Sequence, residues 1–268
     1  MQAEDRARAI VELVRGDGFQ AIEALALQFG VTPQTIRRDV NLLCDRGLLR
    51  RRHGGVELPP EVENLAYPAR QVLNIDAKRR IAQLVAREVP EGASLFFGIG
   101  TTPEQCAQAL ADHPGLRVMT NNLNVALALS RNASCEITVA GGRLRNLDHD
   151  VVAGDAHGFF SRFAVDIGIY GVGGVAEDGT LLDFSTDEVA MRSELARHCR
   201  RRFLVLDHSK FGRGATVRGG HLAEASVVFT DRPVPDPIAR QLKEAGVRLV
   251  CRSDDVVSTA STGQTRRG

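Results

Sequence analysis

A short basic segment near the N-terminus limits what the first 60 residues can be. The stretch from Arg37 to Arg52 holds six of the 34 Lys and Arg residues but only two acidic ones, a net charge of +4. The first 60 residues together hold nine Lys and Arg against eight Asp and Glu, so the positive charge is concentrated and not general. A local arginine cluster of this kind indicates a surface that binds a nucleic-acid backbone.

The residues around this segment predict a helix-turn-helix followed by a hairpin. Asp5 to Val14 and Ile22 to Phe29 both show apolar residues at helical spacing, and glycines follow each run. Thr32 can cap a third helix with Pro33 in its first turn, where a missing amide costs nothing. The segment LLRRRHGGVEL, from 48 to 58, then predicts two short strands joined at Gly54-Gly55, which form a wing.

The third helix is expected to present its polar face to DNA. Ile36, Val40 and Leu43 face the core at helical spacing, which leaves the residues between them outside. We expect Arg37, Arg38 and the wing arginines to contact phosphates, and Gln34, Thr35 and Asn41 to include the residues that contact bases. The complete set of candidate DNA-binding residues is Thr32, Gln34, Thr35, Arg37, Arg38, Asn41, Arg50, Arg51, Arg52 and His53.

Length and composition fit a two-domain globular regulator. The 268 residues are 43% hydrophobic, no run of 18 apolar residues occurs, and the N-terminus is charged, so we expect a cytoplasmic protein without a membrane span. Five scattered cysteines without a CxxC pair predict reduced thiols and no metal site. The predicted divisions are a winged helix-turn-helix domain at 1–58, a linker at 59–75, an effector-sensing α/β domain at 76–252 and a disordered tail at 253–268.

From Asp76 onward, helical and strand patterns alternate. This alternation predicts a mostly parallel sheet with helices on both faces. The expected strands are Ser94 to Phe97, Arg117 to Thr120, Ile137 to Ala140, Asp166 to Tyr170, Phe203 to Asp207, Val227 to Thr230 and Arg248 to Cys251.

Four polar loops follow these strands, at the edge where ligands bind in open α/β sheets. In the first, glycines at 98 and 100 allow close backbone approach, and Thr101 and Thr102 begin a helix whose N-terminus suits a phosphate. The others offer Asn121 and Asn122, then Gly141 with Arg143, then Asp207 with Lys210. Each loop alone is equally consistent with an ordinary cap or turn, but four at one edge favour a ligand site.

The segment VTPQTIRRDVNLLCDRGLLRRRHGGVEL resembles the winged helix-turn-helix of the DeoR family of bacterial repressors. The strings SLFFGIGTTPEQCAQAL, RVMTNNLNVALAL and LDHSKFGRGA extend the resemblance over roughly 4 to 231. It implies a sensor domain similar to the ribose-5-phosphate isomerase fold and an effector that is a phosphorylated sugar or polyol, most specifically glycerol 3-phosphate. It also implies a repressor of genes for glycerol or glycerol 3-phosphate metabolism.

The same resemblance assigns the effector-binding residues. It places Gly100, Thr101 and Thr102 at the phosphate, and Asn121, Asn122, Gly141, Asp207 and Lys210 around the rest of the effector. One position departs from the family pattern, because Gly98 stands where an aspartate is more common. Glu188 matches a recurrent family glutamate whose role the sequence does not define.

Two function classes follow from these features. A ligand-responsive DNA-binding regulator needs a DNA operator, a small phosphorylated metabolite and a homo-oligomer, dimer or tetramer, because one winged helix contacts only a half-site. It needs no cofactor and no membrane, and we expect no enzyme activity. The alternative is an isomerase-like enzyme with an accessory helical domain, in which Lys210 would be the electrophile, but no acidic cluster identifies its base. Repression and activation are not distinguished.

Overall fold

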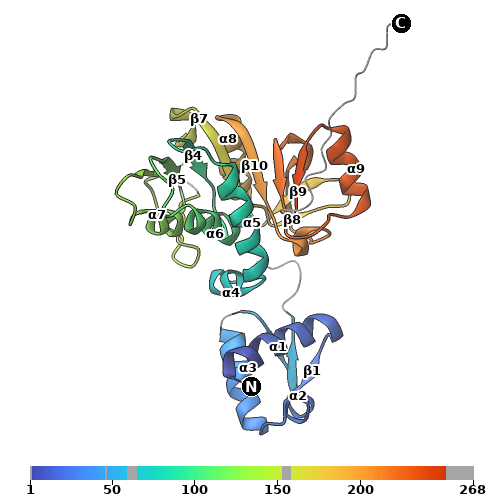
Figure 1. The fold of residues 1–268 in the computed structure, drawn as a ribbon. Coiled ribbons are helices and arrows are strands. Elements are labelled where there is room, and N and C mark those ends of the chain that lie inside the picture. Colours follow the sequence, from blue (N-terminus) through green and yellow to red (C-terminus); the bar gives the residue numbers. More distant parts are fainter. Residues whose placement is uncertain (1, 46, 59–64, 153–157, 252–268) are drawn as a thin grey trace, which may run out of the picture.

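The computed structural model describes residues 2–45, 47–58, 65–152 and 158–251 (Figure 1). The predicted tail at 253–268 and the linker segment 59–64 lie outside the described residues. No helix within the described ranges is long and apolar enough to cross a membrane.

The N-terminal part is a winged helix-turn-helix, as predicted. Its elements are α1 (Ala3–Asp17), β1 (Gln20–Ala21), α2 (Ile22–Phe29), α3 (Pro33–Asp45), β2 (Arg50–Arg52) and β3 (Gly55–Glu57). The strands form an antiparallel sheet in the order β1-β3-β2. Ile10, Leu25, Ile36 and Leu43 are fully or almost fully buried in its core, which confirms the helical spacing. The two-residue strand β1 was not predicted.

A buried ion pair fixes α3 against α1. The guanidinium Nε of Arg6 lies 2.6 Å from Oδ2 of Asp39, and both side chains are largely inaccessible to solvent. The pair supplies a partner for the Asp39 carboxylate on the inner side of α3, where an unpaired buried charge would destabilise the fold. It also keeps that negative charge away from the exposed face of the helix.

The C-terminal part is built on a seven-stranded, entirely parallel sheet with the order β13-β12-β10-β7-β4-β5-β6. Its strands are β4 (Ser94–Phe97), β5 (Arg117–Thr120), β6 (Glu136–Val139), β7 (Val165–Tyr170), β10 (Cys199–Val205), β12 (Val227–Phe229) and β13 (Arg248–Val250). All seven predicted strands are therefore confirmed, with boundaries that shift by a few residues at most.

Helices cover both faces of this sheet. On one face, α5 (Ile75–Glu88), α6 (Thr101–Ala109) and α7 (Leu123–Leu129) bury Ile81, Cys106 and Val125 against it. On the other face, α8 (Thr186–Arg197) and α9 (Asp236–Glu244) bury Leu195 and Leu242. This is the doubly covered parallel sheet that the alternating pattern predicted.

Two features differ from the predictions. The segment predicted as a linker, 59–75, contains the helix α4 (Tyr67–Val72), and α5 already begins at Ile75. Pro68 lies in the first turn of α4, where proline starts a helix instead of breaking it. A small antiparallel sheet, in the order β11 (Val217–His221), β9 (Thr180–Asp183) and β8 (Gly174–Val175), was also not predicted.

Gly54 and Gly55 of the wing are required for different reasons, one for its backbone conformation and the other for lack of space. A Cβ at Gly55 would overlap the carbonyl oxygen of Gln20 and lie 2.7 Å from Cζ of Phe19, whereas Gly54 has open space but a φ of +74°. We expect Gly54→Ala to cost about 1 kcal/mol through its left-handed backbone, and Gly55→Ala to cost more because backbone must move. Amide hydrogen exchange of residues 50–57 measures both, and equal effects would contradict the steric argument.

Candidate functional site

The exposed face of α3 carries the residues predicted for DNA contact. Gln34, Arg37, Arg38 and Asn41 are exposed, and Thr35 is partly buried. The hydroxyl of Thr32 accepts a hydrogen bond from the amide of Thr35 at 3.2 Å, so Thr32 caps the helix as expected. Together with the exposed His53 in the wing turn, these side chains form one polar and basic surface.

The three wing arginines divide into two groups. Arg50 and Arg52 lie on one side of β2, where they pair with Glu57 of β3 at 2.6 and 2.7 Å. Arg50 and then Arg52 lower the pKa of the Glu57 carboxyl by these hydrogen bonds. Arg51 points the other way and donates a hydrogen bond to the side-chain oxygen of Asn41 on α3. This contact joins the wing to α3, which the sequence did not indicate, and it leaves the side-chain NH2 of Asn41 for a base.

A second site is a cavity of about 350 Å³ at the carboxyl edge of the parallel sheet. It lies where the winding of the sheet reverses, between β4 and β7, the usual position of ligand sites in open α/β folds. Gly100, Thr101 and Thr102, after β4, line it together with Asp207 and Lys210, after β10. Five of the eight predicted effector-binding residues thus meet at one cavity.

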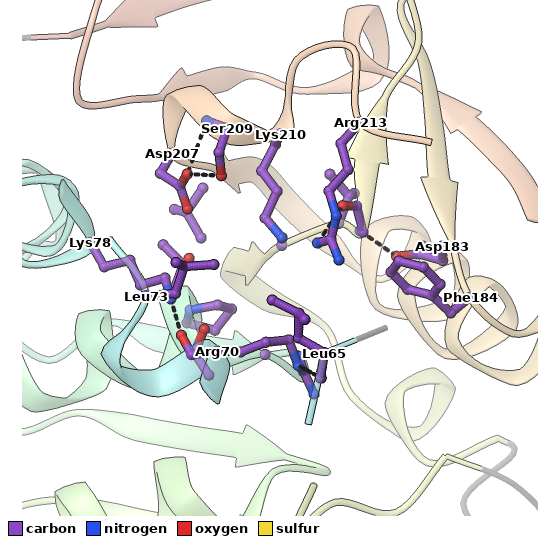
Figure 2. A pocket seen from close by; sticks show the side chains of 18 of the residues that line it. Leu65, Arg70, Leu73, Lys78, Asp183, Phe184, Asp207, Ser209, Lys210 and Arg213 are labelled. Carbon is purple, nitrogen blue, oxygen red and sulfur yellow. Dashed lines mark hydrogen bonds between the residues drawn. The ribbon is translucent and has the colours of Figure 1, made fainter. Parts of the chain in front are cut away.

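Four cationic side chains surround this cavity (Figure 2). Lys210 and Arg213 extend into it from one side, and Arg70 of α4 and Lys78 of α5 lie on the facing side. The first turn of α6 adds its backbone amides, which have no partner inside the helix. The sequence pattern does not indicate Arg70, Lys78 and Arg213, because none of them lies in the first few residues after a predicted strand.

Burial in this cavity disfavours the charged forms of Lys78 and Lys210. Burial, followed by the charge of Arg213, lowers the pKa of Lys210 to about 7. Burial is also the main reason that the pKa of Lys78 falls to about 8, and Asp207 partly opposes this shift. The charge of Asp207 partly opposes the lowered pKa of Lys210, but no hydrogen bond to the Lys210 ammonium is found among the described residues. A bound anion would supply one.

The carboxylates at the cavity are occupied by other protein groups. Asp183 pairs with Arg192 at 2.9 Å, and Glu188 pairs with Arg145 at 2.9 Å. Asp207 accepts hydrogen bonds from the side-chain amide of Asn74 at 2.9 Å and from the amide of Ser209 at 3.0 Å. These partners leave the cavity with a positive character. Glu188 lines the cavity, and its carboxylate is engaged by Arg145.

Three predicted residues lie elsewhere. Asn122 caps α7 by accepting a hydrogen bond from the amide of Asn124 at 3.0 Å, and Gly141 is exposed, so neither lines the cavity. Their contact with an effector stays a prediction, because the Asn122 side chain serves as a helix cap and Gly141 has no side chain to offer a ligand.

Asn121 lines a small adjoining cavity of about 20 Å³ together with Gly98. The two cavities share Glu188 among their walls. The side-chain nitrogen of Asn121 donates to the carbonyl of Val151 at 2.8 Å, while its buried oxygen has no partner among the described residues. The space is large enough for one oxygen atom, so a hydroxyl could reach it.

Comparisons with known proteins cover both parts of the chain. Residues 6–62 match the DeoR-like helix-turn-helix domain, and residues 73–232 match the DeoR C-terminal sensor domain. The glycerol-3-phosphate regulon repressor of Escherichia coli K12 is 41% identical over 249 residues, which cover 93% of this chain and 99% of that protein. The repressor of the same name from Haemophilus influenzae is 43% identical over 250 residues, covering 93% of this chain and 97% of that protein.

Solved structures show weaker similarity. Ribose 5-phosphate isomerase A from Methanocaldococcus jannaschii aligns with 52% of this chain and 55% of its own, at 14% identity and a TM-score of 0.39. The delta subunit of eIF2B from Chaetomium thermophilum covers 85% of this chain and 70% of its own, at 12% identity and a TM-score of 0.45.

The lowered pKa of Lys210 predicts that this side chain destabilises the ligand-free protein. A lysine with a pKa near 7 when folded and 10.5 when unfolded costs most below pH 7, and the cost falls as pH rises toward 10.5. Lys210→Met should therefore raise the melting temperature at pH 6.5, by about 2–4 °C for each kcal/mol gained, and the gain should shrink at pH 9. Thermal melts at both pH values measure this, with exposed Lys243→Met as the control. A lower melting temperature for Lys210→Met at pH 6.5 would contradict it.

Proposed function

The chain belongs to the DeoR family, and on that premise we propose that it is a transcriptional repressor of glycerol or glycerol 3-phosphate metabolism genes that a small phosphorylated polyol releases from its operator. The cavity carries this proposal: four cationic side chains and a helix N-terminus converge on about 350 Å³ in a chain that also has a basic winged helix. The names of the two repressors at 41% and 43% identity suggest glycerol 3-phosphate as the effector.

We assign the phosphate to the amides of Thr101 and Thr102 with Lys78 and Lys210. Charge-assisted hydrogen bonds to an ammonium are among the strongest that a phosphate can form, so the lysines would contribute much of the affinity. The unpartnered oxygen of Asn121 in the adjoining cavity is a candidate acceptor for a hydroxyl group of the effector. This combination selects a molecule with both a phosphate and hydroxyl groups.

The isomerase alternative finds less support at the same cavity. An isomerase needs a carboxylate or another base that is free to take a proton from carbon. Asp183 and Glu188 are held by arginines, and Asp207 is held by Asn74 and Ser209. Matches to the helix-turn-helix and sensor models over most of the chain favour the regulator. We further propose that two or four copies assemble, so that paired winged helices bind paired half-sites.

The wing gives a prediction about DNA affinity. Arg51→Ala should weaken binding to all sequences and reduce the slope of log affinity against log salt by about 0.9 for each phosphate that the variant no longer neutralises. Arg8→Ala is the matched control, because Arg8 is also exposed but pairs with Asp5 on α1. Binding to a duplex selected by this protein from a random library, measured at several salt concentrations, tests it. An unchanged slope for Arg51→Ala would contradict a wing contact.

Release by the effector is the direct test of the proposal. Glycerol 3-phosphate should weaken binding of the parent protein to the selected duplex by 10-fold to 100-fold, a coupling of roughly 1.4 to 2.7 kcal/mol. Lys210→Met should bind the duplex with near-parental affinity but no longer release it, whereas Lys243→Met should behave like the parent. Glycerol without the phosphate should release neither protein.

Two outcomes of this titration would count against the proposal in different ways. Equal release of the Lys210→Met variant and the parent would remove the cavity from the mechanism. Failure of every phosphorylated polyol or sugar to release the parent would overturn the repressor mechanism itself.

A further inference from the structure

Helix α4 is part of the core of the DNA-binding domain. Ala69 is fully buried in the same apolar cluster as Ile10 and Leu43, and Leu65 packs against that cluster. Gly47, which follows α3, lies so close that a Cβ there would be 3.1 Å from Cβ of Ala66. A shift of α4 therefore cannot occur without changing the packing behind the DNA-binding helix.

The same helix is also fastened to the sensor domain (Figure 1). The hydroxyl of Tyr67 donates to Oε2 of Glu104 at 2.5 Å, and the side-chain amide of Gln71 lies 3.2 Å from both carboxylate oxygens of Glu104. Glu104 is buried in the first turn of α6, the helix whose N-terminus faces the cavity. Thus α4 bridges the cavity wall and the winged helix.

Two cations at the cavity hold α4 in this position. Arg70 donates from Nε to the carbonyl of Leu65 at 2.9 Å and from Nη2 to the carboxylate of Asp148. Lys78 donates from Nζ to the carbonyl of Arg70. Both side chains also line the cavity, opposite Lys210. An anion can therefore bind Arg70 and Lys78 only if these side chains break, or share, the hydrogen bonds that fix α4.

We propose that an anion bound in the cavity competes with Asp148 for Arg70, and that the loss of this ion pair loosens α4 and releases the winged helix from its operator-binding arrangement. This inference rests on the proposed function and names the residues that couple its two sites. In this proposal the guanidinium turns from Asp148 toward the bound anion, which gives the protein two arrangements that a ligand can bias.

The exchange of partners costs little on either side. Arg70 moves from a carboxylate to a phosphate, which forms charge-assisted hydrogen bonds at least as strong. Asp148 does not become an isolated charge, because Nη2 of Arg145 lies 3.9 Å from its Oδ2. Its side chain is also 21% exposed and can be hydrated. The ligand therefore needs only a modest preference for the loosened arrangement.

The test is the substitution Asp148→Asn in the full-length protein, with glycerol 3-phosphate as the probe. Without the competing carboxylate, Arg70 is already available, so half-release from the selected duplex should need roughly tenfold less ligand, the effect of one charge-assisted hydrogen bond. Operator affinity without ligand should fall several-fold, because α4 has lost an anchor. A merely structural role for Asp148 would lower stability without shifting the ligand dependence.

The matched control is Asp76→Asn, which removes the same charge from an exposed pair with Arg79 on α5, 3.7 Å apart. It should leave ligand dependence and operator affinity unchanged. If Asp148→Asn changes both by less than twofold, the proposal is overturned.

A measurement on the parent protein settles the matter if the variant does not fold. Glycerol 3-phosphate should accelerate amide hydrogen exchange in α4, including the amide of Leu73 that bonds to Ala69, while it protects the start of α6. Slower or unchanged exchange in α4 would overturn the proposal. Release of the parent without these changes refutes only the role of α4, whereas no release at all refutes the proposed function.

Discussion

The sheet reverses its winding between β4 and β7, and the cavity exists because of this reversal. The chain leaves β4 for α6 on one face and leaves β7 for elements that pack on the other, so the two loops diverge at the carboxyl edge. Gly171 follows β7 in this region, and a Cβ on it would lie 3.5 Å from Cδ of Pro103 and from the carbonyl oxygen of Val205, which is an ordinary contact distance.

The positive charge around the cavity determines which kind of ligand it can bind. Burial lowers the pKa values of Lys210 and Lys78 to about 7 and about 8, and nearby carboxylates could have stabilised their charges. The carboxylates of Asp183 and Glu188 do not neutralise the lysines, because Arg192 pairs with Asp183 and Arg145 pairs with Glu188. Burial acts to raise the pKa of Asp207, but the charge of Lys210 helps to hold it below its usual value. This one carboxylate compensates only part of the positive charge of the four cations. The proposed anion site would thus lower the stability of the protein in return for affinity, a trade-off that is common in proteins.

Local patterns in the sequence predicted the elements with strong periodicity and the residues that directly follow strands. The apolar runs of β4 and β5 were located at the correct residues, and Thr101, Thr102, Asp207 and Lys210 were found because parallel strands end at one edge. The β8, β9 and β11 strands were missed because they are short, and β8 and β11 also contain glycine. Arg70, Lys78 and Arg213 come from helices and a distant turn, and only tertiary packing brings them to the cavity. Asn122 shows another limit, since a helix cap and a ligand contact both use an asparagine side chain, and the sequence does not distinguish them.

The length of α4 explains why it suits a coupling role. A helix of six residues cannot hold itself together in water, because nucleation costs more than so few hydrogen bonds return. Its order therefore depends on interactions from outside: Ala69 in the winged-helix core, and Tyr67, Gln71 and Arg70 toward the sensor. Removing one of these interactions weakens the others, because they share the same few residues. A longer helix that is stable by itself would stay in place after the loss of one ion pair. In the proposed mechanism α4 instead shifts, and the shift changes the packing of the DNA-binding domain.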